Sequence, residues 1–138
     1  KENNVIAIFS PVFTRSYKNE VSAVKSAEII KGEILEYNKR FTDKIEFGIA
    51  VGSGEIINKI EGGKLKFTAL GNLMPSVKRI AETSNKQILL TKEAFGRAGN
   101  EVKAVKKGDV YEAQRVLDNE QNQKFIEGFL ERMEKGNK

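Results

Sequence analysis

The side chains present in this chain limit the chemistry it can perform. It has no Cys and no His, which excludes disulfides, thiolate nucleophiles, the usual structural zinc sites and histidine acid–base catalysis. Any catalysis must therefore rest on carboxylates, Lys, Arg, Tyr or hydroxyl groups. Two segments have the composition of a candidate site, "GSG" at 52–54 and "GNLMPSVKRI" at 71–80.

The segment "GSG" could cradle a phosphate, but it matches neither a P-loop nor a dinucleotide fingerprint. A turn between two strands is the simpler interpretation. The segment 71–80 is a tight turn followed by a helix, with Leu73, Val77 and Ile80 at helical spacing. Pro75 falls in the first helical turn, where a missing N–H would have no intrahelical partner.

Composition sets the class of protein. The length of 138 residues suits one domain with a real core. With 39% hydrophobic and 31% charged residues, and no apolar run of about 18 residues, the sequence predicts a soluble cytoplasmic protein with no membrane span. It opens on Lys1 and resembles a piece of a longer protein. The net charge of +5 allows an anionic partner, but Lys and Glu are intermixed, which favours a solvated surface over a nucleic-acid surface.

Hydrophobic periodicity predicts the elements of the first half of the chain. The run "VIAIF" at 5–9 is typical of a buried strand. Apolar residues at helical spacing predict one long helix over about 18–41. Alternation over 45–51 predicts a strand, and segments 56–60 and 65–70 predict an antiparallel hairpin. The helix is marked by Ala23, Ala27, Ile30, Ile34 and Phe41.

The second half predicts a helix from Leu73, a buried strand at 87–90, a short helix with Thr91 as its N-cap, and two closing strands. The whole order predicts an α+β fold, a ferredoxin-like antiparallel sheet with helices packed on one face. We expect one domain over 1–118, followed over 119–138 by a polar linker and an amphipathic helix. The apolar stripe of that helix is Ile126, Phe129, Leu130 and Met133.

Three motifs in order, "GIAVG" (48–52), "GNLMPSVKRI" (71–80) and "ILLTKEAF" (88–95), resemble the catalytic domain of class III adenylate and guanylate cyclases. The resemblance covers roughly residues 3–117. It implies a family chemistry in which two Asp carboxylates hold two divalent metal ions. An Asn and an Arg stabilise the ribose and the charge that develops on phosphate. A head-to-tail dimer supplies the two halves of the site.

Matched position by position, the chain keeps part of that set. The first metal-binding Asp of the family would lie upstream, and the second falls at Asn3, whose amide carries no negative charge. The family's catalytic Asn falls at Pro75, which has no side-chain donor. The family's Arg is present as Arg79, the base-contacting position falls at Thr68, and Asn72 matches the turn.

The resemblance therefore implies a degenerate, inactive cyclase-homology domain used for regulation, dimerisation or nucleotide sensing. We expect a homodimer or heterodimer through the cyclase-type interface, with ATP or GTP as candidate ligands of Thr68, Asn72 and Arg79. We expect no cofactor, and Mg²⁺ or Mn²⁺ only if a site is completed elsewhere. Each residue also has a structural explanation. Thr68 is a β-prone strand residue, Asn72 is a turn or cap residue, and Arg79 is a solvated or salt-bridged helix residue.

Two other functions stay open at this point. One is an active nucleotide cyclase completed by a missing N-terminal segment or by a partner subunit, against which Asn3 and Pro75 argue. The other is a basic RNA-binding module on a ferredoxin-like sheet. That module calls for aromatic residues on the central strands, and "GGKLKFTAL" offers only Phe67, so we do not expect nucleic acid as a partner.

Overall fold

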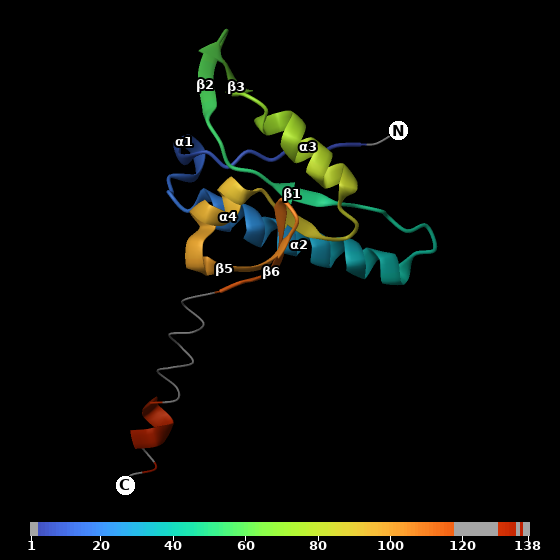
Figure 1. The fold of residues 1–138 in the computed structure, drawn as a ribbon, viewed down its shortest axis with the longest axis vertical. Helices are drawn as coiled ribbons and strands as arrows, with labels where there is room; N and C mark the ends of the chain where they lie inside the picture. The colour runs from blue at the N-terminus through green and yellow to red at the C-terminus, as the bar shows by residue number, and fades with distance from the viewer. Residues whose placement is uncertain (1–2, 118–129, 135, 137–138) are drawn as a thin grey trace.

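The computed structural model describes residues 3–117, 130–134 and 136, and its body is built on a mixed four-stranded sheet (Figure 1). The strand order is β1-β4-β6-β5. β1 pairs parallel with β4, whereas β6 pairs antiparallel with both β4 and β5. This architecture confirms the predicted α+β class with a ferredoxin-like sheet. The strands are β1 (Ile49–Val51), β4 (Ile88–Leu90), β5 (Val102–Lys107) and β6 (Val110–Val116).

Two helices, α2 (Asn19–Arg40) and α4 (Lys92–Ala98), pack on this sheet and enclose the core (Figure 1). Leu90 and Val24 are fully buried at its centre. Apolar burial of this kind is the main favourable term in folding. The buried core cluster consists of Val21, Val24, Ala27, Val51, Ile88, Leu90, Ala94, Ala98 and Val102.

Helix α2 was predicted almost to its ends, but only its first half is core. Ala27 is buried, whereas Ile30 and Phe41 are exposed by half or more. The helix has 22 residues and is therefore about 33 Å long, which exceeds the width of the sheet that it crosses. Its C-terminal half extends past the strands, so the predicted apolar stripe is only partly covered there: Ile34 is half-buried, whereas Ile30 and Phe41 are exposed.

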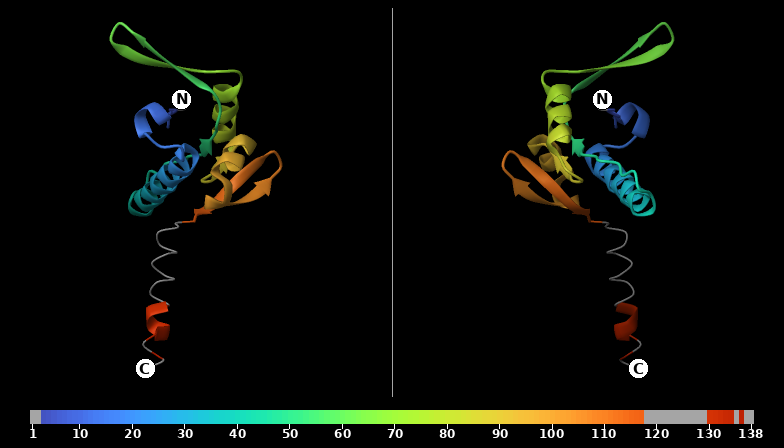
Figure 2. Two further views of the ribbon diagram at one scale, coloured as in Figure 1. Left: turned by 90° about the vertical axis from the view of Figure 1, so that its left-hand side faces the viewer. Right: turned by 90° about the vertical axis from the view of Figure 1, so that its right-hand side faces the viewer.

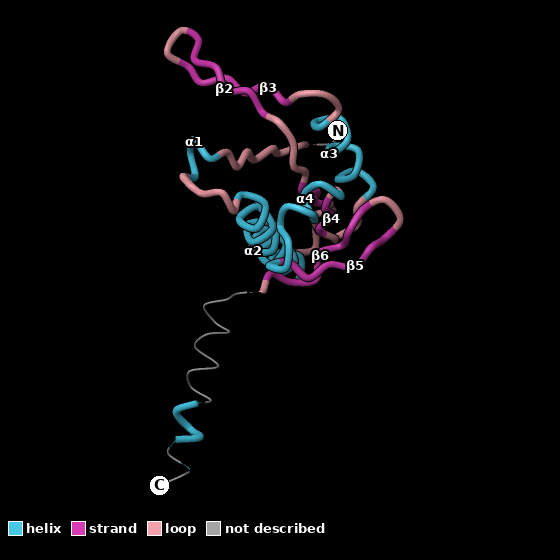
Figure 3. Tube along the Cα trace, turned by 60° about the vertical axis from the view of Figure 1, so that its left-hand side comes forward, coloured by secondary structure: helices cyan, strands magenta, loops and turns pink. Residues whose placement is uncertain are grey.

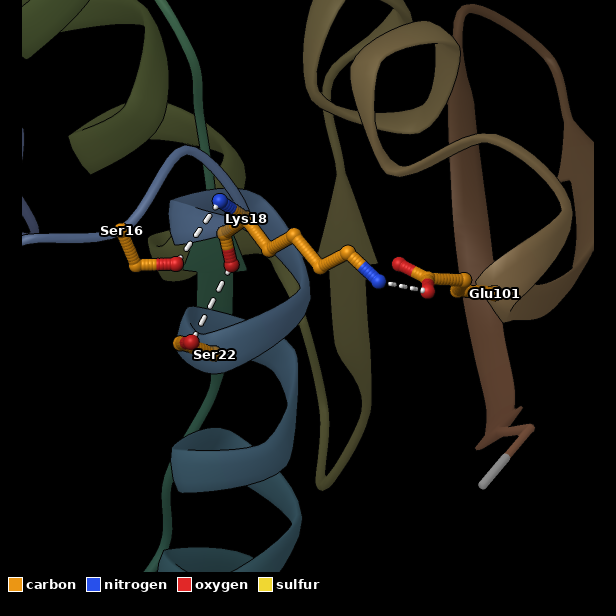
Figure 4. Close-up of polar contacts among 4 residues, drawn as sticks. All are labelled: Ser16, Lys18, Ser22 and Glu101. Carbon is orange, nitrogen blue, oxygen red and sulfur yellow. Dashed lines mark hydrogen bonds and ion pairs between the residues drawn. The ribbon is translucent and has the colours of Figure 1, made fainter. Parts of the chain in front are cut away.

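The start of α2 is fixed by three polar contacts around Lys18 (Figure 4). The backbone N–H of Lys18 donates to the Ser16 hydroxyl at 3.0 Å, and the Ser22 hydroxyl donates to the Lys18 carbonyl at 3.1 Å. The Lys18 ammonium lies 2.6 Å from the Glu101 carboxylate. Glu101 closes the short 3-10 helix η1 (Gly99–Glu101) before β5, so this ion pair joins two distant parts of the chain.

The predicted strand at 5–9 is wrong. The segment is a loop leading into α1 (Pro11–Thr14) (Figure 3), with Val5 exposed by 94% and Ile6 by 59%. Within the described part of the chain no strand pairs with it. An apolar composition alone does not make a buried strand, because the backbone N–H and C=O groups of the segment also need a neighbouring strand as hydrogen-bond partner.

The hairpin was predicted correctly, but it stands apart from the main sheet. β2 (Ile56–Glu61) and β3 (Lys64–Ala69) form a separate two-stranded sheet that projects from the body (Figure 2). Gly62 and Gly63 make its turn with φ of 57° and 75°, values that favour glycine and suit a two-residue hairpin loop. The predicted strand at 45–51 is confirmed only over β1.

The predicted division at residue 118 stays a prediction. The polar linker and the stripe residues Ile126 and Phe129 lie outside the described residues. Leu130 and Met133 lie in a helical segment and are both more than half exposed.

Candidate functional site

Helix α3 (Leu73–Thr83) carries most of the predicted site, and the glycines that flank β1 let it pack closely there. A Cβ atom at Gly48 would collide with the carbonyl oxygens of Ala81 and Ser84, and one at Gly52 would collide with Val77. Close packing therefore accounts for the glycines of "GIAVG". The interpretation of "GSG" as a turn rather than a phosphate cradle agrees with this, because Leu73 occupies the space beside Gly54.

The N-terminus of α3 places Pro75 as the sequence predicts. Pro75 is the third residue of the helix, and the first helical hydrogen bond runs from the Ser76 N–H to the Asn72 carbonyl at 3.0 Å. The missing N–H of proline is therefore tolerated there. Asn72 occupies the cap position, but its side chain makes no capping hydrogen bond.

Pro75 and Arg79 lie one helical turn apart on the solvent side of α3, and both are exposed. Among the described residues the Arg79 side chain makes no ion pair and no hydrogen bond, so its guanidinium is solvated. A solvated arginine on an open surface can meet an incoming anion or a second chain.

Thr68 lies on the projecting hairpin rather than on the body (Figure 2). It is exposed and pairs with Ile57. Its face of the hairpin continues with Lys59 and Lys66, which flank Glu61 at 2.8 and 2.9 Å. These two ammonium groups, Lys59 foremost, hold the pKa of the Glu61 carboxyl below its ordinary value. Thr68 thus stands at the base of a charged surface, with no hydrogen bond linking it to Asn72 or Arg79 in the described chain.

Asn3 lies in the exposed N-terminal loop. Among the described residues no group of three or more Asp, Glu, His or Cys side chains could hold a metal ion. The structure therefore places the five matched positions on three parts of the fold: the N-terminal loop, β3, and helix α3 with its N-cap.

Sequence reasoning missed a basic groove of about 580 Å³ at the C-terminal end of α2. Its cations are Lys39, Arg40, Lys44 and Lys86. The signal in the sequence was the basic run "NKRFTDK" at 38–44, which spans the end of the predicted helix and the loop after it. Lys86 comes from the turn before β4, and only the folded chain brings it to the same groove.

The sheet, the projecting hairpin and helix α3 together define a cyclase-like fold. The crystal structure of the guanylyl cyclase Cya2 is similar to this chain, with a TM-score of 0.56 and 18% sequence identity. The match covers 73% of this chain and 60% of that chain, so the chain spans about three-fifths of the cyclase it matches. No protein-family model and no curated protein matches the sequence. In the part of the chain that is described, no helix has the length and apolarity needed to cross a bilayer.

Proposed function

We propose that this chain is a catalytically inactive cyclase-homology domain that works as a dimerisation and regulatory module. The observation that carries the proposal is the exposed face of α3 within a cyclase-like fold. There Pro75 takes the place of an amide donor, while Arg79 next to it keeps its charge. Losing one such donor raises a reaction barrier by about 3–4 kcal/mol, and Asn3 supplies no carboxylate for a metal.

The projecting hairpin supports dimerisation. Near the tip of the hairpin Ile60 is exposed by 76%, and its cross-strand partner Leu65, on the same face, is exposed by 37%. An isolated two-stranded hairpin is at best marginally stable in water, and clustered exposed apolar side chains mark interaction surfaces. Phe13 holds the hairpin base through a ring contact to Phe67 at 5.3 Å between centroids. A second copy or a related chain would cover the remainder of the arm.

Arg79 would be the residue that this domain contributes to the dimer. In that arrangement Arg79 binds the phosphates of ATP or GTP. Thr68 on β3 and Asn72 in the turn before α3 also contact the nucleotide. A regulatory role requires only that the domain bind a nucleotide, not that it convert it. A cation on a solvated helix face can bind a phosphate through charge-assisted hydrogen bonds without any metal.

Three measurements test the proposal. We expect no cyclic nucleotide from this chain with ATP or GTP and Mn²⁺, and a concentration-dependent dimer in analytical ultracentrifugation that Ile60→Lys dissociates. Calorimetric titration with each nucleotide should show binding that Arg79→Ala weakens about tenfold. Lys78→Ala is the matched control, since Lys78 is an exposed cation on the same helix. Cyclic nucleotide production would contradict inactivity, and a monomer at all concentrations would contradict dimerisation.

A further inference from the structure

The basic groove at the end of α2 contains none of the residues to which the cyclase resemblance assigns metal, catalytic or nucleotide contacts. Leu35 and Asn38 of α2 line one side, the loop that follows supplies Lys44, and the turn between α3 and β4 supplies Lys86. The volume of about 580 Å³ is within the range of small-molecule sites, about 300–1,000 Å³. Its lining differs from most such sites in carrying four cations beside the apolar side chains of Leu35 and Phe41.

The groove is preorganised. The Asn38 side chain donates to the Ile45 carbonyl at 2.9 Å and accepts from the Ile45 N–H at 2.7 Å, which fixes both ends of the loop. The ring of Phe41 stacks on Tyr37 with 4.5 Å between centroids. The Lys86 N–H donates to the Phe47 carbonyl at 2.8 Å, so the opposite wall is tied to the same segment.

Two of the four cations have a structural explanation and two have none. Lys39 and Arg40 complement the negative end of the α2 dipole, and Glu36 lies 3.6 and 4.0 Å from them. Those exposed pairs are weak. Lys44 and Lys86 lie off the helix, and neither makes an ion pair with any described residue. The lining thus holds four cations and no acidic residue, and two of the cations, Lys44 and Lys86, have no ion pair in the described chain.

The backbone of Lys86 adds an independent observation. Its φ is +57°, a left-handed conformation in which Gly or Asn is the favoured residue and any other side chain is strained. Strained backbone conformations of this kind gather at functional sites. Because glycine would relieve this strain, Lys86→Gly removes the ammonium group without disfavouring the backbone conformation of the turn.

We propose that this groove binds a compact oligophosphate, a small molecule recognised through its phosphate charges. Lys44 and Lys86 supply the positive charge that lies off helix α2, and Lys39 and Arg40 supply the charge on the helix side. The two hydrogen bonds from Asn38 to Ile45 hold the loop in place. This binding goes beyond the proposed dimerisation module and does not involve Arg79. The site and its ligand would persist in a monomer.

The test is calorimetric titration of the whole chain with sodium tripolyphosphate at two salt concentrations. We expect binding that weakens at the higher salt and that falls about tenfold in either Lys86→Gly or Lys44→Gln. Lys86→Gly should also raise the melting temperature, because it relieves the left-handed strain. Weaker ligand binding in a more stable protein separates loss of the site from loss of the fold.

Two controls make the result decisive. Lys25→Gln removes the same charge from an exposed position on the same helix, away from the groove, and should leave binding unchanged. Arg79→Ala should also leave it unchanged. The proposal is overturned by an absence of binding, by equal weakening in Lys25→Gln, or by a loss of binding confined to Arg79→Ala, which would place the phosphates at α3. ATP that binds no better than tripolyphosphate would support recognition of the phosphates alone.

Discussion

The Asn38 side chain takes the place of a strand partner for Ile45, with hydrogen bonds of 2.9 and 2.7 Å to its carbonyl and N–H groups. The backbone of Ile45 is therefore satisfied by helix α2 rather than by a neighbouring strand. Ile45 therefore lies outside β1, which begins at Ile49, although the alternating pattern starts at Ile45.

We expect Asn38→Ala to destabilise the protein by about 1–2 kcal/mol, because two hydrogen bonds of about 1 kcal/mol each are lost. Urea unfolding followed by circular dichroism measures the change. Asn100→Ala is the control, since Asn100 is exposed and makes no side-chain hydrogen bond within the described chain. Equal effects of the two substitutions would contradict a specific role for Asn38.

Gly48 and Gly32 should respond in opposite directions to alanine. Gly48→Ala inserts a methyl group against the Ala81 and Ser84 carbonyl oxygens, whereas a Cβ at Gly32 meets nothing within 4 Å. Overpacking destabilises by about 1–3 kcal/mol, and removing glycine from an exposed helix interior stabilises by about 1 kcal/mol. Thermal unfolding of both variants gives the sign of each change in stability. An unchanged melting temperature in Gly48→Ala would show that α3 does not pack closely on β1.

Pro75→Asn should not create cyclase activity. It restores the amide that the cyclase family places at this position, but Asn3 still supplies no carboxylate for a metal ion. We expect the variant to fold, because position 75 is exposed and in the first helical turn. An assay for cyclic nucleotide with Mn²⁺ and ATP or GTP checks this, and turnover by the single variant would show that a metal site exists elsewhere.

Protonation of the Glu112 carboxylate should lower the free energy of unfolding at acidic pH. A hydrogen-bonded ion pair with Lys107 at 2.7 Å lowers its pKa from the ordinary 4.5, while burial opposes the shift. Because the folded-state pKa is depressed, the stabilisation is present above pH 4.5 and is lost as the pH falls through the folded-state pKa. Urea unfolding at a series of acidic pH values should show a smaller loss in Glu112→Gln than in the wild type.

Local signals in the sequence were sufficient where the interaction itself is local. Gly62 and Gly63 fixed the hairpin turn because few residues adopt positive φ easily. Thr91 caps α4 as predicted, accepting from the Ala94 N–H at 3.2 Å. The period of α2 gave its bounds within a residue or two, since helical hydrogen bonds join residues only four positions apart.

Tertiary structure decided everything that depends on a distant neighbour. The sequence of 5–9 is as apolar as that of β4, yet β4 is buried between two strands and 5–9 has no strand beside it in the described chain. In the same way the sequence contained Lys44 and Lys86 but not the groove, because 42 positions separate them and only the fold brings them together. Side-chain type is encoded locally, whereas burial and proximity are properties of the packed chain.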